Sequence, residues 1–317
     1  MRPADLAPRV FSTVGLPAAR RVELWETHNA AALIGLDVHA TGPLDATELN
    51  VQLPEVQLAR VTGSAHAVRR TAAVIERSPA DAIAVYLTLR GDASFSYPDG
   101  TRTLRPGNVL ICETDRPFGR EFARGLEELV VKVPRAALAA RCEVPRLREP
   151  VIATVGAARG GGQYARALAR MTSRATRASQ PLPASEATVL DLVAVLAAGR
   201  AAAPATAHRA AACSYIEEHL TNPKLGADQV AAAIGISDRQ LSRVFAADGT
   251  SVPRHILSRR LQLACSLLCS EPAGDLTVAD IAVRCGFTSA AYFSHAFREQ
   301  YGQRASDIRR GGTLGNR

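Results

Sequence analysis

The stretch ADQVAAAIGISDRQLSRVF, from Ala227 to Phe245, carries a pattern that the chain repeats as TVADIAVRCGFTSAAYFSHAF, from Thr277 to Phe297. One small residue, one glycine and two large apolar residues recur in the same order. The matched pairs are Ala231 and Ala282, Gly235 and Gly286, Leu241 and Phe293, and Phe245 and Phe297. Because an internal repeat fixes architecture, each copy is expected to form a short helix, a turn containing glycine, and a second helix.

The first copy predicts a supporting helix over Ala227–Ile234, a turn at Gly235, and a second helix that begins after Ser237. Ser237 belongs to the residue types preferred as an N-cap. Gln240 follows three residues later, and this spacing predicts a capping box. Both copies therefore follow the order of elements found in helix-turn-helix proteins, which bind DNA.

The second helix of the first copy is expected to have one apolar and one polar face. Its apolar residues recur at i, i+3 and i+4 and are expected to face a core. They are Leu241, Val244 and Phe245. The opposite face of a recognition helix enters the major groove, where arginine makes bidentate hydrogen bonds to guanine. We predict four DNA-binding residues here, with an ordinary solvated basic face as the alternative: Ser237, Arg239, Ser242 and Arg243.

The second copy has its own capping box, Thr277 with Asp280, and a recognition helix that begins at Thr288 or Ser289. Its outward positions offer weaker base contacts, because alanine only touches a thymine methyl and histidine is charged only part of the time near neutral pH. Two arginines further on are expected to hold phosphates. The predicted DNA-binding residues of this copy are Thr288, Ala291, Ser294, His295, Arg298 and Arg304.

A helix between the copies is predicted over Pro253–Cys269, because apolar residues recur there at helical spacing. At about 1.5 Å per residue this rod is roughly 24 Å long. With its flanking helices it is long enough to set two recognition helices about one DNA turn, ~34 Å, apart. A single chain is therefore expected to occupy two successive major grooves.

The N-terminal half has a different pattern, with short apolar or alternating segments that Gly, Pro and Asp divide. The predicted strands are Val56–Val61, Ile83–Leu89, Ala93–Tyr97, Asn108–Ile111 and Leu126–Val133. The turn 97–100, Tyr-Pro-Asp-Gly, is typical of a hairpin. Short strands at close spacing without intervening helices favour an antiparallel barrel or a jelly roll. Residues 1–25 are expected to be peripheral to it.

Two helices are expected after the barrel, over Gln163–Ser179 and Glu186–Ala198, with Ser185 as the N-cap of the second. The second helix is apolar on two faces, so it either packs on the barrel or forms a dimer interface. We expect an α+β protein with three parts. These are a cupin-like effector-binding and dimerisation domain over 1–200 (barrel about 30–141, helices about 160–200), a linker over 201–207, and an all-α double helix-turn-helix domain over 208–310.

Catalytic or metal-binding chemistry has little support in the sequence. His28, His39 and His66 are isolated and form no H-x-H pair, so the barrel is expected to hold no metal and no cofactor. The six cysteines form no CxxC motif and are expected to be reduced. Cys265 and Cys269 stand at i,i+4 on an apolar helix face, where core packing is the main interpretation and a redox or metal role the alternative.

The bulk composition is that of a globular protein, and its charge is compatible with a polyanionic partner. The formal net charge is +8, which is compatible with nucleic-acid binding but is spread along the chain. No apolar run reaches the roughly 18 residues of a membrane helix, and the first residues lack the apolar core of a secretory signal. We expect a cytoplasmic protein without a membrane partner.

The span from about His208 to Arg310 resembles the DNA-binding domain of the AraC/XylS family of transcriptional regulators. The resemblance is carried by residues in both repeats and in the helix between them. They are Ala231, Gly235, Ser237, Leu241, Arg243, Phe245, Arg260, Leu261, Ala264, Leu268, Ile281, Ala282, Cys285, Gly286, Phe287, Tyr292, Phe293, Phe297, Arg298, Tyr301 and Gly302. The chain departs from the family at His295, where Arg or Lys is usual, and at Ala305 and Ile308, where the family has P-x-x-Y.

The N-terminal region, from about Leu24 to Arg141, resembles the family's sensor domain, a cupin-type barrel. The resemblance lies in residues 58–66, in the Pro-Gly turn at 106–107 and in residues 131–135. It implies small-effector binding or dimerisation and not catalysis, with the effector-binding residues unknown.

These observations predict a transcriptional regulator that binds double-stranded promoter DNA and is not an enzyme. The resemblance implies an activator, controlled by a small-molecule effector in the barrel, that forms a homodimer and contacts RNA polymerase. Two alternatives remain: a constitutive dimeric regulator whose barrel is purely structural, and a cupin-type enzyme fused to a DNA-binding domain.

Overall fold

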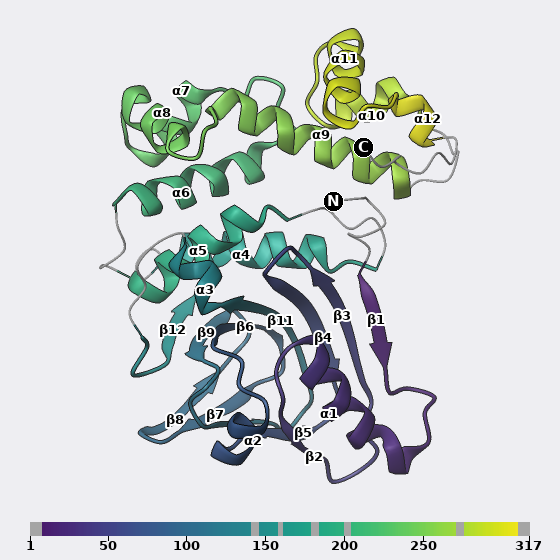
Figure 1. Ribbon diagram of the computed structural model, residues 1–317, viewed down its shortest axis with the longest axis vertical. Helices are drawn as coiled ribbons and strands as arrows, with labels where there is room; N and C mark the ends of the chain where they lie inside the picture. The colour runs from purple at the N-terminus through teal and green to yellow at the C-terminus, as the bar shows by residue number, and fades with distance from the viewer. Residues whose placement is uncertain are drawn as a thin grey trace. The chain divides into compact units, whose positions relative to one another are not determined.

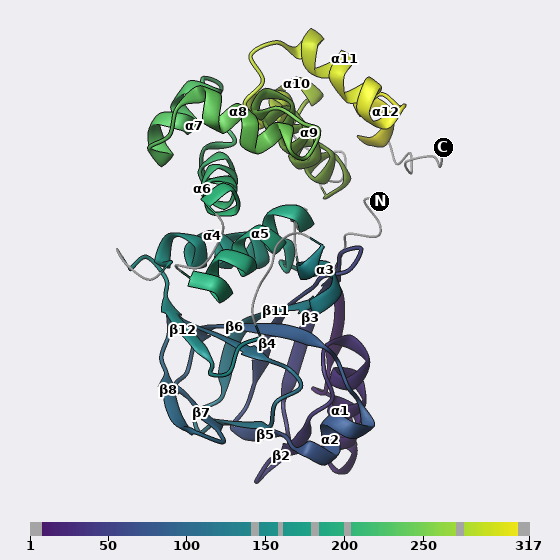
Figure 2. The same cartoon turned by 60° about the vertical axis from the view of Figure 1, so that its left-hand side comes forward.

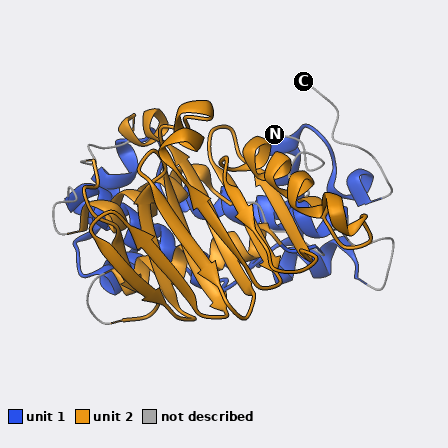
Figure 3. Ribbon diagram, turned by 90° about the horizontal axis from the view of Figure 1, so that it is seen from below, with its two compact units in different colours: residues 1–7, 177–183, 203–317 blue, residues 8–176, 184–202 orange. Residues whose placement is uncertain are grey.

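The computed structural model describes residues 8–140, 146–157, 161–178, 184–199, 204–270 and 276–309. The chain divides into two compact units, which Figure 3 colours separately. The barrel unit comprises residues 8–176 and 184–202, and the helical unit comprises residues 1–7, 177–183 and 203–317. The first unit contains all the strands described and the second only helices, so the predicted α+β fold class is confirmed.

The barrel unit is built from two antiparallel sheets, and Figure 1 labels their strands except β10; Figure 2 gives a second view. The seven-stranded sheet has the order β1 (Arg9–Ser12), β3 (Ala46–Gln52), β4 (Gln57–Gly63), β11 (Leu126–Pro134), β6 (Ala82–Arg90), β9 (Asn108–Glu113) and β12 (Val151–Thr154). The five-stranded sheet has the order β2 (Asp37–His39), β5 (His66–Arg70), β10 (Phe118–Phe122), β7 (Ala93–Tyr97) and β8 (Gly100–Leu104). All five predicted strands are present, and β7 and β8 form the predicted hairpin, with Tyr97 opposite Gly100.

The main apolar cluster of the barrel unit draws on both sheets. Phe95, Leu104 and Leu110 are almost fully buried in it. The helix α1 (Arg21–Ala32) adds Trp25, which is also buried there. The expectation that residues 1–25 are peripheral is therefore wrong from β1 onward, because β1 pairs with β3 and α1 contributes to this core. A weak apolar periodicity hid α1 in the sequence.

The remaining helices of the barrel unit are η2 (Ala18–Arg20), α2 (Ala72–Arg77), α3 (Arg135–Ala139), α4 (Gly162–Ala175) and α5 (Glu186–Ala198). α4 packs on β4 and β11 and ends at Ala175, before the predicted end at Ser179, which lies outside the described residues. α5 has the predicted bounds, and the Ser185 hydroxyl accepts the N-cap hydrogen bond. α5 packs against α3, α4 and β12, which supports the interpretation that its apolar surface is used within the chain.

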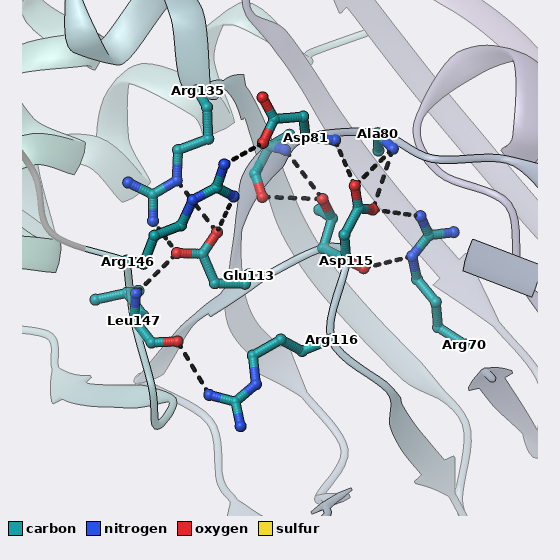
Figure 4. A network of polar contacts seen from close by, with 11 residues as sticks. Arg70, Ala80, Asp81, Glu113, Asp115, Arg116, Arg135, Arg146 and Leu147 are labelled. Atoms are coloured by element: carbon teal, nitrogen blue, oxygen red, sulfur yellow. Dashed lines mark hydrogen bonds and ion pairs between the residues drawn. The ribbon is translucent and has the colours of Figure 1, made fainter. Parts of the chain in front are cut away.

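A polar network fixes the loops at one end of the barrel (Figure 4). The buried Arg70 guanidinium donates hydrogen bonds to the carbonyls of Gly35, Ser78 and Thr114 and pairs with the Asp115 carboxylate. Three segments distant in sequence are thereby joined through one side chain. A buried cation needs this degree of pairing, so the network has a structural role.

The helical unit contains seven helices in its described part: α6 (Pro204–His219), α7 (Ala227–Ile234), α8 (Asp238–Ala246), α9 (Val252–Ser270), α10 (Val278–Arg284), α11 (Ala290–Tyr301) and α12 (Ala305–Arg309). α6 begins at Pro204 and takes in residues 204–207 of the predicted linker. Proline is tolerated in a first helical turn, because the N–H that it lacks has no partner there.

Two separate apolar cores hold the helical unit together. α6, α7, α8 and the start of α9 enclose one, in which Phe245 is fully buried. The end of α9 encloses the other with α10, α11 and α12, and Phe293 and Phe297 are fully buried there. α9 thus joins two helix-turn-helix units, as Figure 1 shows. Its 19 residues span about 28 Å at 1.5 Å per residue.

Two details correct the predictions for this unit. Only half of the predicted capping box at Ser237 is among the described hydrogen bonds, in which the Ser237 hydroxyl accepts from the Gln240 N–H at 3.2 Å. The box at Thr277 and Asp280 is complete.

Cys265 is buried as expected, but Cys269 is exposed, so the core interpretation is wrong for Cys269. Cys142 lies outside the described residues. None of the described helices meets the length and apolarity needed to cross a membrane.

Candidate DNA interface and barrel cavity

The face of α8 that points away from its core carries two exposed arginines. Leu241 and Phe245 are fully buried on the inner side of the helix, while Arg239 and Arg243 are exposed on the outer side, four residues apart. Among the residues described, neither guanidinium has a carboxylate within 4.0 Å. Both cations are therefore available to an anionic partner. Ser242 is exposed beside them.

Ser237 differs from the other three predicted residues of this repeat because it is the N-cap of α8. Its hydroxyl caps α8, so one of its lone pairs is occupied by the Gln240 N–H. It positions the recognition helix, and its exposure leaves its hydroxyl proton able to reach a phosphate.

The corresponding face of α11 is less basic. Ala291, Ser294 and His295 are exposed, and the Ser294 hydroxyl donates to the Ala290 carbonyl at 2.9 Å. His295 Nδ1 lies 3.9 Å from Glu299 Oε2, and both side chains are about four-fifths exposed. Glu299 places a negative charge where the first repeat has none, and such a charge opposes phosphate binding.

The other predicted residues of the second repeat surround α11. Ser289 is the N-cap, with its hydroxyl 3.2 Å from the Tyr292 N–H, so Thr288 precedes the helix. Arg298 is exposed in the last turn of α11, and Arg304 is exposed between α11 and α12.

One exposed side chain was missed as a candidate contact. Tyr292 is 56% exposed on α11, although its neighbour Phe293 is fully buried. In the sequence, Tyr292 stood out only as part of the family pattern. Its spacing from His295 and Glu299, at i+3 and i+7, was the signal that it shares the outward face.

The two turns between supporting and recognition helices differ in how much space they leave. Gly235 and Gly286 both have left-handed backbone angles, with φ of +73° and +84°. A Cβ on Gly235 would meet nothing within 4 Å. A Cβ on Gly286 would meet the backbone carbonyl oxygens of Thr221 and Leu220 at 3.0 and 3.1 Å. The second turn is therefore held against the end of α6, and the first is open.

A cavity lies between the two sheets and α1 in the barrel unit. It encloses about 560 Å³ of space free of protein atoms, including the solvent at its mouth. Its walls are mainly apolar, and the polar side chains among its lining residues are Asn29, His66, Tyr86, Arg120, Glu128 and Lys132. Such a mainly apolar cavity with a few polar groups is the usual form of a small-molecule site.

An ion pair crosses the cavity wall from β10 to β11. Arg120 donates to Glu128 through both terminal nitrogens, at 2.8 and 2.5 Å, and both side chains are buried. The guanidinium carbon lies 4.0 Å from the centre of the Tyr86 ring, in cation–π geometry. This arrangement gives the cavity a fixed, neutralised polar wall.

The barrel contains little that could act as a nucleophile or hold a metal. Burial raises the pKa of the Cys112 thiol to about 12, so the reactive thiolate is scarce near neutral pH. Burial also lowers the pKa of His66. In the part of the chain that the structure describes, no three His, Cys, Asp or Glu side chains are grouped as metal ligands.

Comparison with known families matches both units. The AraC-binding-like domain matches residues 28–214, more than half of the chain, and a helix-turn-helix domain matches residues 230–311. The chain belongs to the AraC family. This AraC-family protein is therefore a helix-turn-helix DNA-binding transcriptional regulator, which accounts for the duplicated motif.

Relatives match this AraC-family regulator over different lengths. Transcriptional activator RhrA of Rhizobium meliloti is 40% identical over 96 residues, 30% of this chain and 30% of RhrA. Transcriptional activator NphR of a Rhodococcus species is 24% identical over 256 residues, 78% of this chain and 76% of NphR. The crystal structure of the AraC-like activator CuxR, 20% identical, covers 81% of this chain and 94% of CuxR with a TM-score of 0.47.

The residues that line the cavity were not predicted from the sequence. The strand β11 held the available signal, since Glu128 and Lys132 interrupt an apolar strand at positions that share one face. Arg120 gives a similar signal within β10. Charged residues inside buried strands are uncommon, and here they mark the cavity.

Proposed function

We propose that this AraC-family regulator is a homodimeric activator that binds promoter DNA and is controlled by a small-molecule effector in the barrel cavity. The observation that carries the proposal is the pair of exposed arginines on α8, Arg239 and Arg243, which have no carboxylate within 4.0 Å among the described residues. Two cations four residues apart on one helical face suit the major groove and its phosphates.

The first repeat supplies most of the sequence reading in this proposal. Arg239, Ser242 and Arg243 contact bases or phosphates, and Ser237 positions their helix. The second repeat anchors the protein, with Ala291, Ser294 and His295 in the groove. Thr288, Arg298 and Arg304 are assigned to phosphates. The support is the difference in charge between the exposed faces of α8 and α11.

The two units divide the work in the same proposal. Residues 1–200 bind the effector and form the dimer, and residues 208–310 bind DNA. The effector acts by binding one arrangement of the protein more tightly than another, because only such a difference shifts the population that binds DNA. The cavity between the sheets supports an effector site in this unit.

Activation and contact with RNA polymerase are proposed from the relatives. RhrA and NphR are both named transcriptional activators. The effector, by favouring the DNA-bound dimer, places the regulator where polymerase can be recruited. A cytoplasmic location follows from a partner that is chromosomal DNA.

The test selects duplexes from a random library with the full chain and measures affinity for the winning sequence by fluorescence anisotropy. We expect a preference of at least ~10³-fold over random DNA and a steep fall in affinity with salt. Equal binding to random DNA would contradict the DNA-reading role. Candidate effectors are small molecules that raise the melting temperature of the barrel unit. If none of them changes the affinity for DNA, the barrel is structural and the regulator is constitutive.

A further inference from the structure

We infer that the barrel cavity takes a small apolar molecule with one carboxylate, and that Lys132 holds this carboxylate. The inference rests on the proposed effector site and names the chemistry of its occupant. Lys132 lies on β11 and lines the cavity together with Glu128 and Val130 of the same strand.

The charges that line the cavity leave one cation without a counter-ion. Arg120 and Glu128 neutralise each other through their two hydrogen bonds. The Lys132 ammonium donates to the Leu33 carbonyl at 2.7 Å, which is the one hydrogen bond found for it among the described residues. The carboxylate of Asp115 acts on Lys132 at longer range but is paired with Arg70 at 2.8 Å.

Burial and the nearby Arg70 cation lower the pKa of Lys132, because both disfavour its charged form. A ligand carboxylate beside the ammonium would supply the missing compensation. A ligand amine would instead add a second cation to a half-buried one. The net charge of the cavity therefore favours an anion over a neutral or cationic ligand.

The lining of the cavity includes donors without a hydrogen-bond partner in the described chain, beside acceptors on Asn29, His66 and Glu128. Arg120 Nε is buried and has no hydrogen-bond partner among the described residues. The Tyr86 hydroxyl is also without one in this part of the chain, and the Lys132 ammonium retains unused protons. A buried donor without a partner is costly, so a ligand that brings acceptor oxygens is stabilised here.

The walls limit the rest of the ligand to an apolar body. Trp25, Leu33, Val61, Val68, Phe122 and Leu126 contribute apolar side chains to the lining. A polyol would lose water from many hydroxyls and find few acceptors in return. Within the sheet, Lys132 pairs with Ala84 and Val130 pairs with Tyr86, so the carboxylate end lies two residue pairs along the strands from the Tyr86–Arg120 stack.

The experiment compares matched ligands that share one apolar skeleton. Calorimetric titrations of the full chain at pH 7 use 3-phenylpropanoate, 3-phenylpropanamide and 3-phenylpropylamine, and a second set uses hexanoate, hexanamide and hexylamine. We expect at least one acid to bind, at least tenfold more tightly than its amide, with no binding of its amine. An amide or amine that binds as tightly as its acid, or the failure of both acids, overturns the inference.

The variant Lys132→Met is expected to weaken binding of the acid at least tenfold. The matched control is Lys224→Met, because Lys224 is the only other lysine of the chain, is exposed, and lies in the helical unit. Unchanged acid affinity in a folded Lys132→Met protein overturns the role of Lys132.

A measurement on the unmodified protein covers the case in which Lys132→Met does not fold. Acetic anhydride labels the two lysines, and mass spectrometry follows each rate. The acid should slow acetylation of Lys132 and leave the rate at Lys224 unchanged; equal rates at Lys132 with and without the acid contradict the inference.

The affinity for DNA is measured in parallel. Acid binding without any effect on DNA affinity refutes effector control but does not contradict the inferred class of ligand.

Discussion

Arg243 and His295 occupy equivalent positions on the two recognition helices, yet they differ in what they can offer to DNA. Arg243 is exposed without a carboxylate partner in the described chain, whereas His295 lies 3.9 Å from Glu299. An arginine makes two parallel hydrogen bonds to guanine, and a histidine makes one. We therefore predict that the difference between these two residues decides which repeat reads the sequence.

The variant Arg243→Ala is expected to weaken binding to the selected duplex by ~1–3 kcal/mol and to relax specificity at one base position. Anisotropy titrations on the selected duplex and its single-base variants measure both effects. His295→Ala should cost less than Arg243→Ala. Arg102→Ala, which removes an exposed arginine from the barrel unit, is the control and should cost nothing. An equal loss on random DNA would make Arg243 a phosphate contact.

A partly buried histidine, His255, is expected to make the stability of the helical unit depend on pH. Burial, together with the nearby Arg259 cation, lowers the pKa of His255 to about 4, below its ordinary value of 6.5. The unfolded chain then binds the proton more tightly than the folded one, so stability falls as the pH drops from about 6.5 to about 4. The loss is up to about 3 kcal/mol, at 1.36 kcal/mol per pKa unit.

Urea unfolding of His255→Gln, followed by circular dichroism at pH 7 and pH 4.5, checks this dependence. The variant should lose less stability between the two pH values than the wild type. The control is His39→Gln, which changes a histidine of the barrel unit. A wild-type dependence that persists in full in His255→Gln would assign the proton to another group.

At the scale of elements, the two turns that join supporting to recognition helices differ in their tolerance of a side chain. Gly235→Ala forces a residue with a Cβ into the left-handed region and should cost ~1 kcal/mol. Gly286→Ala adds contacts with two backbone carbonyls at 3.0 and 3.1 Å, so we expect it to cost at least ~1 kcal/mol more.

Urea unfolding of the two glycine variants can be followed by circular dichroism, with fluorescence of Trp25, the only tryptophan, as an internal control for the barrel unit. The fluorescence transition should stay in place in both variants. Equal losses of helical stability in Gly235→Ala and Gly286→Ala would show that the contacts around Gly286 relax at no cost.

Elements with a strong local pattern were predictable from the sequence, and elements defined by distant partners were not. The spacing of Leu241, Val244 and Phe245 places α8 without any tertiary information, because the core side of a short amphipathic helix repeats at i, i+3 and i+4. β1 and α1 gave no comparable signal, since their places depend on pairing with β3 and on the burial of Trp25.

The candidate sites show the same division. The exposure of Arg239 and Arg243 could be predicted from helical periodicity. The cavity could not be predicted, because its lining comes from α1 and five strands of two sheets. Cys269 shows the limit of periodicity. It shares the helix face of Cys265 at i,i+4, yet Cys265 is buried and Cys269, one turn closer to the end of α9, is exposed.

At the scale of the whole molecule, the helical unit has two apolar cores of its own, which α9 joins. We expect residues 205–317 alone to bind the selected duplex as a monomer, more weakly than the full-length chain. Analytical ultracentrifugation with labelled DNA gives the stoichiometry. A fragment that folds and does not bind would show that DNA binding needs the barrel unit.

The arrangement of the regulator on DNA can be read from hydroxyl-radical footprinting of the full chain on the selected duplex. Two helix-turn-helix units in successive major grooves predict two protected segments for each protomer, about 10 base pairs apart on one face of the duplex. Arg243→Ala should reduce the protection of one segment more than that of the other. Uniform protection without defined segments, or the same pattern on an unrelated duplex, would contradict a protein that reads promoter DNA through its duplicated motif.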